Sequence, residues 1–62
     1  GGKGERIVRG AVRAYREGKK GINWVVGVIE RAGMEKGDLK RVLEDLNAGD
    51  VLEECRRRGL VE

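Results

Sequence analysis

Arginines recur at every third or fourth position near the start of the chain, and they are the residues best suited to chemistry. Their positions are Arg6, Arg9, Arg13 and Arg16. At 100° per residue, the four side chains fall within about 80° of one another on a helix. A guanidinium group donates paired hydrogen bonds to a phosphate or a carboxylate, so a rigid row of arginines suits either partner. We expect this row, continued by Lys19 and Lys20, to form one contact surface.

A second basic cluster, Arg56, Arg57 and Arg58, lies close to the end of the sequence. Charge is also unevenly distributed along the chain. Residues 1–20 carry seven Lys or Arg and two Glu, whereas residues 35–54 carry three Lys or Arg and seven acids, within a total net charge of +3. Clustered positive charge strengthens nucleic-acid binding by counterion release and steers association with acidic proteins. Both basic clusters are therefore candidate binding residues.

Nucleophilic catalysis is poorly supported by the residue types present. The sequence contains no Ser, Thr or His, so neither a serine-type triad nor a Cys–His pair can form. Cys55 is the only thiol. The arginines that follow it would favour a reactive thiolate, but Cys55 shares a helical face with Val51 and Leu52. The sequence favours a cysteine that fills the core, and we expect no catalytic residue.

Carboxylate and metal chemistry are also disfavoured. Glu44 with Asp45, and Glu53 with Glu54, are neighbours in sequence. Neighbouring side chains on a helix point about 100° apart and cannot converge on one substrate atom. One cysteine without histidine is a poor set of transition-metal ligands. We expect no metal, no cofactor and no small-molecule substrate.

Apolar spacing predicts the elements that position these groups. Residues 5–17 place their apolar side chains on one side and the arginine row on the other, which is typical of an amphipathic helix. Leu39, Val42, Leu43 and Leu46 have the spacing i, i+3, i+4, i+7, which predicts a third helix after a cap at Glu35. Residues 1–4 are predicted to be a flexible lead-in to a single helical domain, residues 5–62.

For two further segments the apolar spacing alone does not decide the secondary structure. Residues 23–32 are apolar on nearly every side, so we expect a central, buried helix that starts at an Asn23 cap and ends before Gly33. Residues 50–58 read as a helix capped by Asp50, with a strand as the alternative. Trp24 and Tyr15 fall on apolar faces, which predicts no exposed aromatic platform for single-stranded nucleic acid. The predicted fold is all-α: a compact bundle of three to four short helices, helix-turn-helix-like.

Glycines separate these predicted helices, because the chain has no proline. Five of the glycines are predicted to end helices, since helix C-termini favour glycine in the left-handed region. The predicted stops are Gly18 and Gly21, Gly33, Gly49, and Gly59.

Composition predicts the type of source organism and the cellular location. Abundant Glu, Lys and Arg beside few thermolabile residues is the pattern of proteins from hot environments, so we expect a thermophilic, archaeal source. One cysteine forms no internal disulfide, which fits a reducing cytoplasm. The longest apolar run, residues 24–29, is far short of a membrane span, and no signal-peptide pattern begins the chain. We expect a soluble cytoplasmic protein without a membrane partner.

Residues 51–62, VLEECRRRGLVE, resemble the end of a recognition helix running into a strand in winged-helix proteins. Leu52, Gly59, Leu60 and Val61 carry the resemblance, and residues 39–49 resemble the helix and turn that precede such a helix. The resemblance covers about 25 residues. It implies double-stranded DNA binding through the last helix, with the three consecutive arginines near the DNA backbone.

The function predicted from the sequence is a non-enzymatic binding module that contacts double-stranded nucleic acid through a basic helix face. The alternative is a small regulatory protein that docks on an acidic protein surface. Its partner would be a replication or transcription protein, for example of the sliding-clamp type. The same arginines serve either partner, so charge alone does not separate the two functions.

Overall fold

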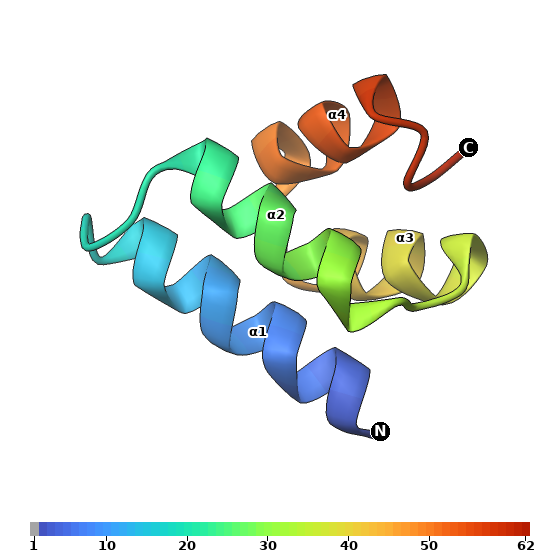
Figure 1. The fold of residues 1–62 in the computed structure, drawn as a ribbon, viewed down its shortest axis with the longest axis horizontal. Coiled ribbons are helices and arrows are strands. Elements are labelled where there is room, and N and C mark those ends of the chain that lie inside the picture. The colour runs from blue at the N-terminus through green and yellow to red at the C-terminus, as the bar shows by residue number, and fades with distance from the viewer. Residues whose placement is uncertain (1) are drawn as a thin grey trace.

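The computed structural model describes residues 2–62, which form four helices and no strand. The helices are α1 (Lys3–Arg16), α2 (Ile22–Ala32), α3 (Lys36–Asp45) and α4 (Gly49–Arg57). The prediction of an all-α bundle is confirmed, and the segment for which a strand was the alternative is helical. In Figure 1, α1 and α2 run side by side in opposite directions, and α2 also packs against α4. None of the four helices has the length and apolar character that crossing a membrane requires.

Helix α1 begins earlier than the sequence predicts. Lys3 and Gly4 belong to the helix, so the lead-in predicted for residues 1–4 is wrong for these two positions, and Gly1 lies outside the described residues. A Cβ atom at Gly4 would lie 2.9 Å from Cγ of Met34. The missing side chain therefore lets the start of α1 approach the connection between α2 and α3.

Left-handed residues end the helices largely as predicted. Gly33 has φ 66° at the end of α2, and Gly18 and Gly59, which follow α1 and α4, both have φ 76°. The stop predicted at Gly49 is wrong, because that residue begins α4. Asn47 instead takes the left-handed conformation, with φ 55°, in the three-residue turn that joins α3 to α4. Asparagine tolerates this region better than most residues do.

Two predicted helix caps are wrong because their side chains are used elsewhere. Gly21 and Ala48 hold the N-cap positions of α2 and α4, and neither makes a side-chain cap. Asn23 lies inside α2, where its Oδ1 accepts a hydrogen bond of 2.7 Å from Nη2 of Arg58. Asp50 lies in the first turn of α4 and accepts from the hydroxyl of Tyr15. Glu35 does precede α3 as predicted.

Every helix contributes apolar side chains to one core, and no polar or charged residue in residues 2–62 is buried. The second helix is less enclosed than its composition predicts. Its core side consists of Val25, Val26 and Ile29, but Trp24 points away from them and is 41% exposed. The core residues are Val8, Ala11, Val12, Val25, Val26, Ile29, Leu39, Val42, Leu43, Ala48, Val51, Cys55 and Val61.

Candidate nucleic-acid interface

Helix α1 carries the predicted arginine row on its exposed side. We call Arg6, Arg9, Arg13 and Arg16 the α1 ridge; all four are exposed. The opposite side of the helix is held against the core by Val8, Ala11 and Val12. The ridge spans eleven residues, so its two ends are ten steps apart, or about 15 Å at a rise of 1.5 Å per residue. Packing of one side of α1 therefore fixes a row of guanidinium groups on the other.

The four ridge arginines differ in their partners. Arg9 donates to Oε2 of Glu5 through Nε at 3.0 Å and Nη2 at 2.8 Å, and this hydrogen bond lowers the pKa of Glu5. Such an exposed pair one turn apart adds little stability, because both charges are well solvated in its absence. The side chains of Arg6 and Arg13 make no hydrogen bond or ion pair with any described residue. These two guanidinium groups are available for a ligand without breaking any contact.

Three arginines of the ridge border a shallow pocket of about 350 Å³. Val12 and Leu46 supply its apolar lining, and Glu17 completes it. Nη2 of Arg16 donates to the backbone carbonyl oxygen of Leu46, which ties the end of α1 to the turn between α3 and α4. The pocket therefore joins positive charge to a small apolar surface. The lining residues are Arg9, Val12, Arg13, Arg16, Glu17 and Leu46.

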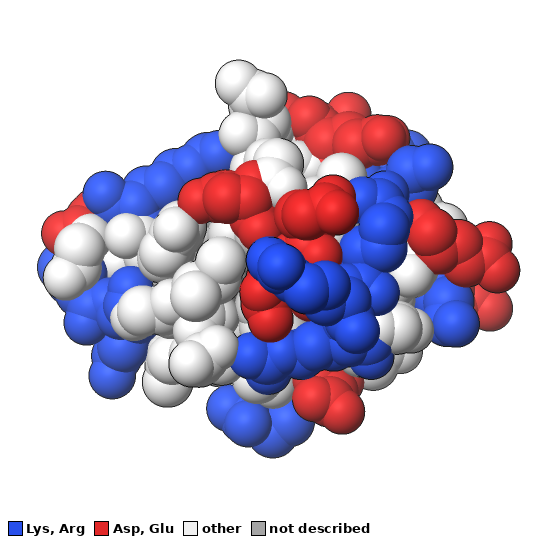
Figure 2. All heavy atoms as spheres, turned by 90° about the horizontal axis from the view of Figure 1, so that it is seen from above, with Lys and Arg blue, Asp and Glu red and all other residues white. Residues whose placement is uncertain are grey.

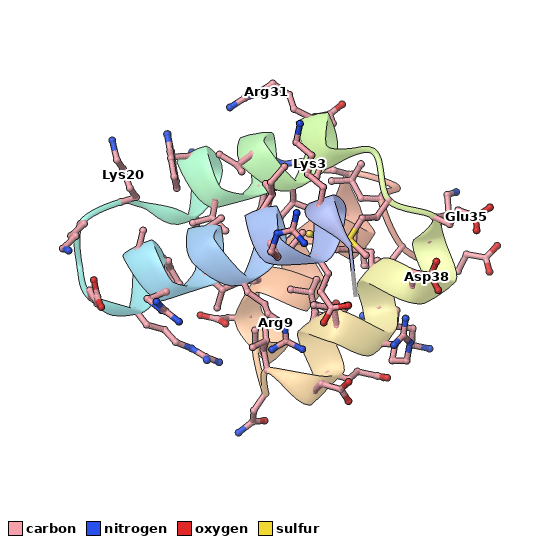
Figure 3. The ribbon with its side chains drawn as sticks, turned by 90° about the horizontal axis from the view of Figure 1, so that it is seen from below. Lys3, Arg9, Lys20, Arg31, Glu35 and Asp38 are labelled. Carbon is pink, nitrogen blue, oxygen red and sulfur yellow. The ribbon has the colours of Figure 1, made fainter. Side chains whose placement is uncertain are left out.

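The two lysines expected to extend the ridge do not continue it. Helix α1 ends at Arg16, and the turn at Gly18 carries the chain toward α2. Lys19 forms an ion pair of 3.0 Å with Glu17. Nζ of Lys20 lies 5.0 Å from the ring centroid of Trp24. Figure 3 shows Lys20 and Arg9 on opposite sides of α1, so the expected single surface is divided in two.

The arginine cluster of α4 is largely neutralised by its own helix. Arg56 pairs with Glu53 at 2.7 Å, and Arg57 and Arg58 pair with Glu54 at 3.1 and 3.3 Å. Figure 2 views the molecule from the side of α4 and shows positive and negative groups interleaved on this face. A ligand phosphate would have to displace glutamates to reach these arginines. The α1 ridge is therefore the better-placed of the two predicted basic clusters.

Sequence reasoning missed an exposed group on α2. Trp24 was expected on an apolar face, but its ring lies at the surface beneath the ammonium group of Lys20. Arg31 lies seven residues after Trp24, on the same side of the helix, and was not among the predicted site residues. The signal was present in the spacing of Lys20, Trp24 and Arg31. The uniformly apolar composition of the segment hid which side faces the core.

The thiol and one of the two carboxylate pairs considered for catalysis are engaged in structural contacts. Cys55 is fully buried, and burial raises the pKa of its thiol to about 11, although the nearby Arg58 charge acts in the opposite direction. This burial confirms the interpretation of Cys55 as a core residue, and the raised pKa disfavours the thiolate. Glu53 and Glu54, the adjacent carboxylates, bind different arginines.

The first half of the fold is the more positive one. Residues 3–33, which form α1 and α2, carry eight Lys or Arg and three Glu, a net charge of +5. Residues 34–62 carry six Lys or Arg and eight acids, a net charge of −2.

Comparison with protein-family models, with curated proteins and with solved structures finds no match. The interpretation of this surface therefore depends on its own residues.

Proposed function

We propose that this protein is a non-enzymatic module that binds double-stranded nucleic acid through phosphate contacts along the α1 ridge. The observation that carries the proposal is the state of Arg6 and Arg13. Both are exposed on the outer side of α1, and neither guanidinium group has a partner among residues 2–62. Duplex DNA presents about one negative charge per 1.7 Å of its axis. A ridge about 15 Å long therefore meets several phosphates at once.

Gly10 supports this interpretation of the ridge. It lies between Arg9 and Ala11 in the middle of α1, where glycine costs helix stability relative to alanine. No atom lies within 4 Å of the position that a Cβ would take, so packing does not require glycine there. A bare helix surface beside the arginines lets a nucleic-acid backbone approach closely.

We expect α4 to contribute less to nucleic-acid binding than the α1 ridge does. Its first two turns present Asp50, Glu53 and Glu54, which repel phosphates. The recognition helix of a helix-turn-helix protein contacts bases with its N-terminal residues. Phosphate binding without base readout is consequently the mode we propose, with Arg56, Arg57 and Arg58 as a secondary surface.

Charge-matched variants test the proposal. Arg6→Ala combined with Arg13→Ala removes two unpaired cations from the ridge. Lys40→Ala combined with Arg41→Ala removes the same net charge from two exposed residues of α3, which belong to neither basic cluster. Fluorescence anisotropy with a labelled DNA duplex should show weaker binding for the ridge variant. The slope of log K against log salt should become less negative by about two, which is about one for each phosphate that the variant no longer neutralises.

The control variant should bind the duplex nearly as well as the unmodified protein does. Equal losses of affinity in the two variants would mean that net charge alone drives binding and that the ridge is not the site. Circular dichroism of both variants checks that the helices are retained.

The pocket beside the ridge favours a second candidate function, docking on an acidic protein. Arg9, Arg13 and Arg16 surround an apolar lining of Val12 and Leu46. This arrangement suits an apolar side chain flanked by carboxylates, because the guanidinium groups pair with the acids while the lining covers the apolar group. A replication or transcription regulator would use the fold in this way.

A pull-down from nuclease-treated lysate separates the two candidates. A stoichiometric protein that is retained by the unmodified chain and absent with Leu46→Ala supports protein docking. Loss of all bound protein after nuclease treatment supports nucleic acid. Leu46→Ala should leave duplex affinity unchanged, because the substitution removes no charge.

A further inference from the structure

Four residues form a line along the outer side of α2, which we call the α2 stripe. They are Lys20, Trp24, Gly27 and Arg31, separated by four, three and four positions. Trp24, Gly27 and Arg31 lie in α2, where this spacing places them one turn apart on the same side of the helix. Lys20 precedes α2 and joins the line because its Nζ lies 5.0 Å from the ring centroid of Trp24. Figure 3 shows Lys20 and Arg31 on one side of α1 and Arg9 on the other. The stripe is therefore a surface separate from the pocket beside the α1 ridge.

The centre of the stripe is an aromatic ring at the surface. Trp24 is the one large apolar residue in residues 2–62 that is exposed, at 41%. Nζ of Lys20 lies 5.0 Å from its ring centroid, within the range of a cation–π contact. The ring contributes less than a buried tryptophan to the core of this chain, so it retains apolar surface that a ligand can cover.

Gly27 and Arg31 continue the surface from the ring. A Cβ at Gly27 would lie 3.5 Å from Nη1 of Arg31, so the guanidinium group lies back over the glycine toward Trp24. Trp24 and Arg31 are about 10 Å apart along the helix axis at 1.5 Å per residue. Because Gly27 adds no side chain, the guanidinium group of Arg31 can lie over it on the side of Trp24. The ring thus has Lys20 over one face and Arg31 beyond Gly27 along the helix, and a base that stacks on the Lys20 face displaces its flexible side chain.

The charges around the ring exclude an acidic surface here. Glu30 is the one acid of α2 and projects from a different side of the helix, about 120° from Trp24. Arg58 approaches from α4 and donates to Asn23, the residue before Trp24. Glu54, the partner of Arg58, is largely covered. The ring therefore lies among cations.

We infer that the α2 stripe binds an unpaired nucleobase in single-stranded nucleic acid, with Trp24 stacking on the base and Lys20 and Arg31 contacting the phosphates on either side. Phosphate, base and phosphate alternate along a single strand, and cation, ring and cation alternate along the stripe. Every base offers a flat face to an aromatic side chain, so the stacking is independent of sequence. A fully paired duplex hides those faces. This inference rests on the proposed nucleic-acid function and adds a second site for unpaired segments.

Because the chain has a single tryptophan, its fluorescence reports directly on the stripe. The experiment titrates the protein with a labelled oligothymidine strand and, separately, with a labelled duplex. Anisotropy of the label gives binding, and tryptophan emission gives stacking. We expect saturating single strand to quench Trp24 strongly. The duplex, held by the α1 ridge, should quench it far less at equal occupancy.

Two substitutions at Trp24 sharpen the test. Trp24→Leu keeps apolar bulk and removes the ring, and should weaken single-strand binding about tenfold or more. Trp24→Phe keeps a ring and should retain most of that affinity. Both variants should bind the duplex as the unmodified protein does, and circular dichroism should confirm that both are helical.

Three results would overturn the inference, and they bear differently on the proposed function. If the single strand binds without quenching Trp24, or if Trp24→Leu binds it as tightly as Trp24→Phe does, the stripe is not the site. In that case the proposed function still stands, provided that duplex binding depends on Arg6 and Arg13. If neither DNA binds at low salt, both proposals fail together.

Discussion

The hydroxyl of Tyr15 donates a hydrogen bond of 2.8 Å to Oδ2 of Asp50, joining the last turn of α1 to the first turn of α4. Oδ1 of the same carboxylate accepts from the backbone N–H of Val51 at 2.9 Å. With the bond from Arg16 to the carbonyl of Leu46, this hydrogen bond fixes the end of the α1 ridge against the second half of the fold. Asp50 thus acts as a link between helices, although the sequence predicted a local cap.

The Tyr15–Asp50 hydrogen bond makes stability depend on pH at both extremes. It raises the pKa of Tyr15 above its ordinary 10.0 and lowers the pKa of Asp50 below its ordinary 3.8. A raised tyrosine pKa means that stability is present below pH 10 and is lost as the tyrosine ionises at higher pH. A lowered aspartate pKa means that stability is present above pH 3.8 and is lost as the carboxylate becomes protonated.

Tyr15→Phe should therefore lower the free energy of unfolding by a constant amount between about pH 5 and pH 9. The difference from the unmodified protein should shrink above that range and below it, because the hydrogen bond is then absent from both chains. Urea denaturation followed by circular dichroism at several pH values measures this difference. A difference that stays the same from neutral pH to beyond the tyrosine transition would show that the hydrogen bond contributes nothing.

Cys55 should react slowly with a disulfide reagent in the folded protein. Burial shields its sulfur and raises the pKa of the thiol to about 11, so that little thiolate exists at pH 8. Relative to an ordinary thiol, ionisation alone slows the reaction on the order of a hundredfold. A control chain with Cys55→Ala and Lys40→Cys moves the thiol to an exposed position on α3 and should react quickly. Equal rates in the two folded chains would contradict the burial of Cys55.

Alanine should have opposite effects at two glycines. Gly10 lies inside α1 with open space around it, so Gly10→Ala should stabilise the fold by about 0.5–1 kcal/mol. Gly33 has φ 66° at the end of α2, a conformation that costs a residue with a Cβ about 1–2 kcal/mol. Gly33→Ala should therefore destabilise the fold. Midpoints of urea unfolding compare the two, and shifts in the same direction would be inconsistent with these backbone conformations.

The helices were predictable because each has a strong local signal. Val8, Ala11 and Val12 recur at helical spacing opposite the arginines, and Leu39, Val42 and Leu43 do so in α3. Gly33 and Gly59 supply left-handed stops. The α3–α4 turn was predicted less well, because Asn47 rather than Gly49 takes the left-handed conformation.

The candidate site was predictable only in part, because tertiary contacts decide which charged groups remain available. The spacing of Arg6 and Arg13 predicted a shared side of α1, and the structure leaves both guanidinium groups without a partner among residues 2–62. Nothing local indicates that Lys20 turns toward Trp24 or that Arg58 reaches Asn23 across 35 positions. The exposure of Trp24 depends on which side of α2 the other helices cover. An apolar pattern without a polar side does not contain that information.

The salt dependence of duplex binding by the unmodified protein tests the central claim most directly. Anisotropy of a labelled duplex, measured at four or more salt concentrations, gives log K against log salt. We expect measurable binding at low salt and a slope of about −2 to −4, corresponding to phosphates bound by Arg6 and Arg13 with or without Arg9 and Arg16. Absence of binding at low salt, or an affinity that salt does not change, would contradict the proposed role of the α1 ridge.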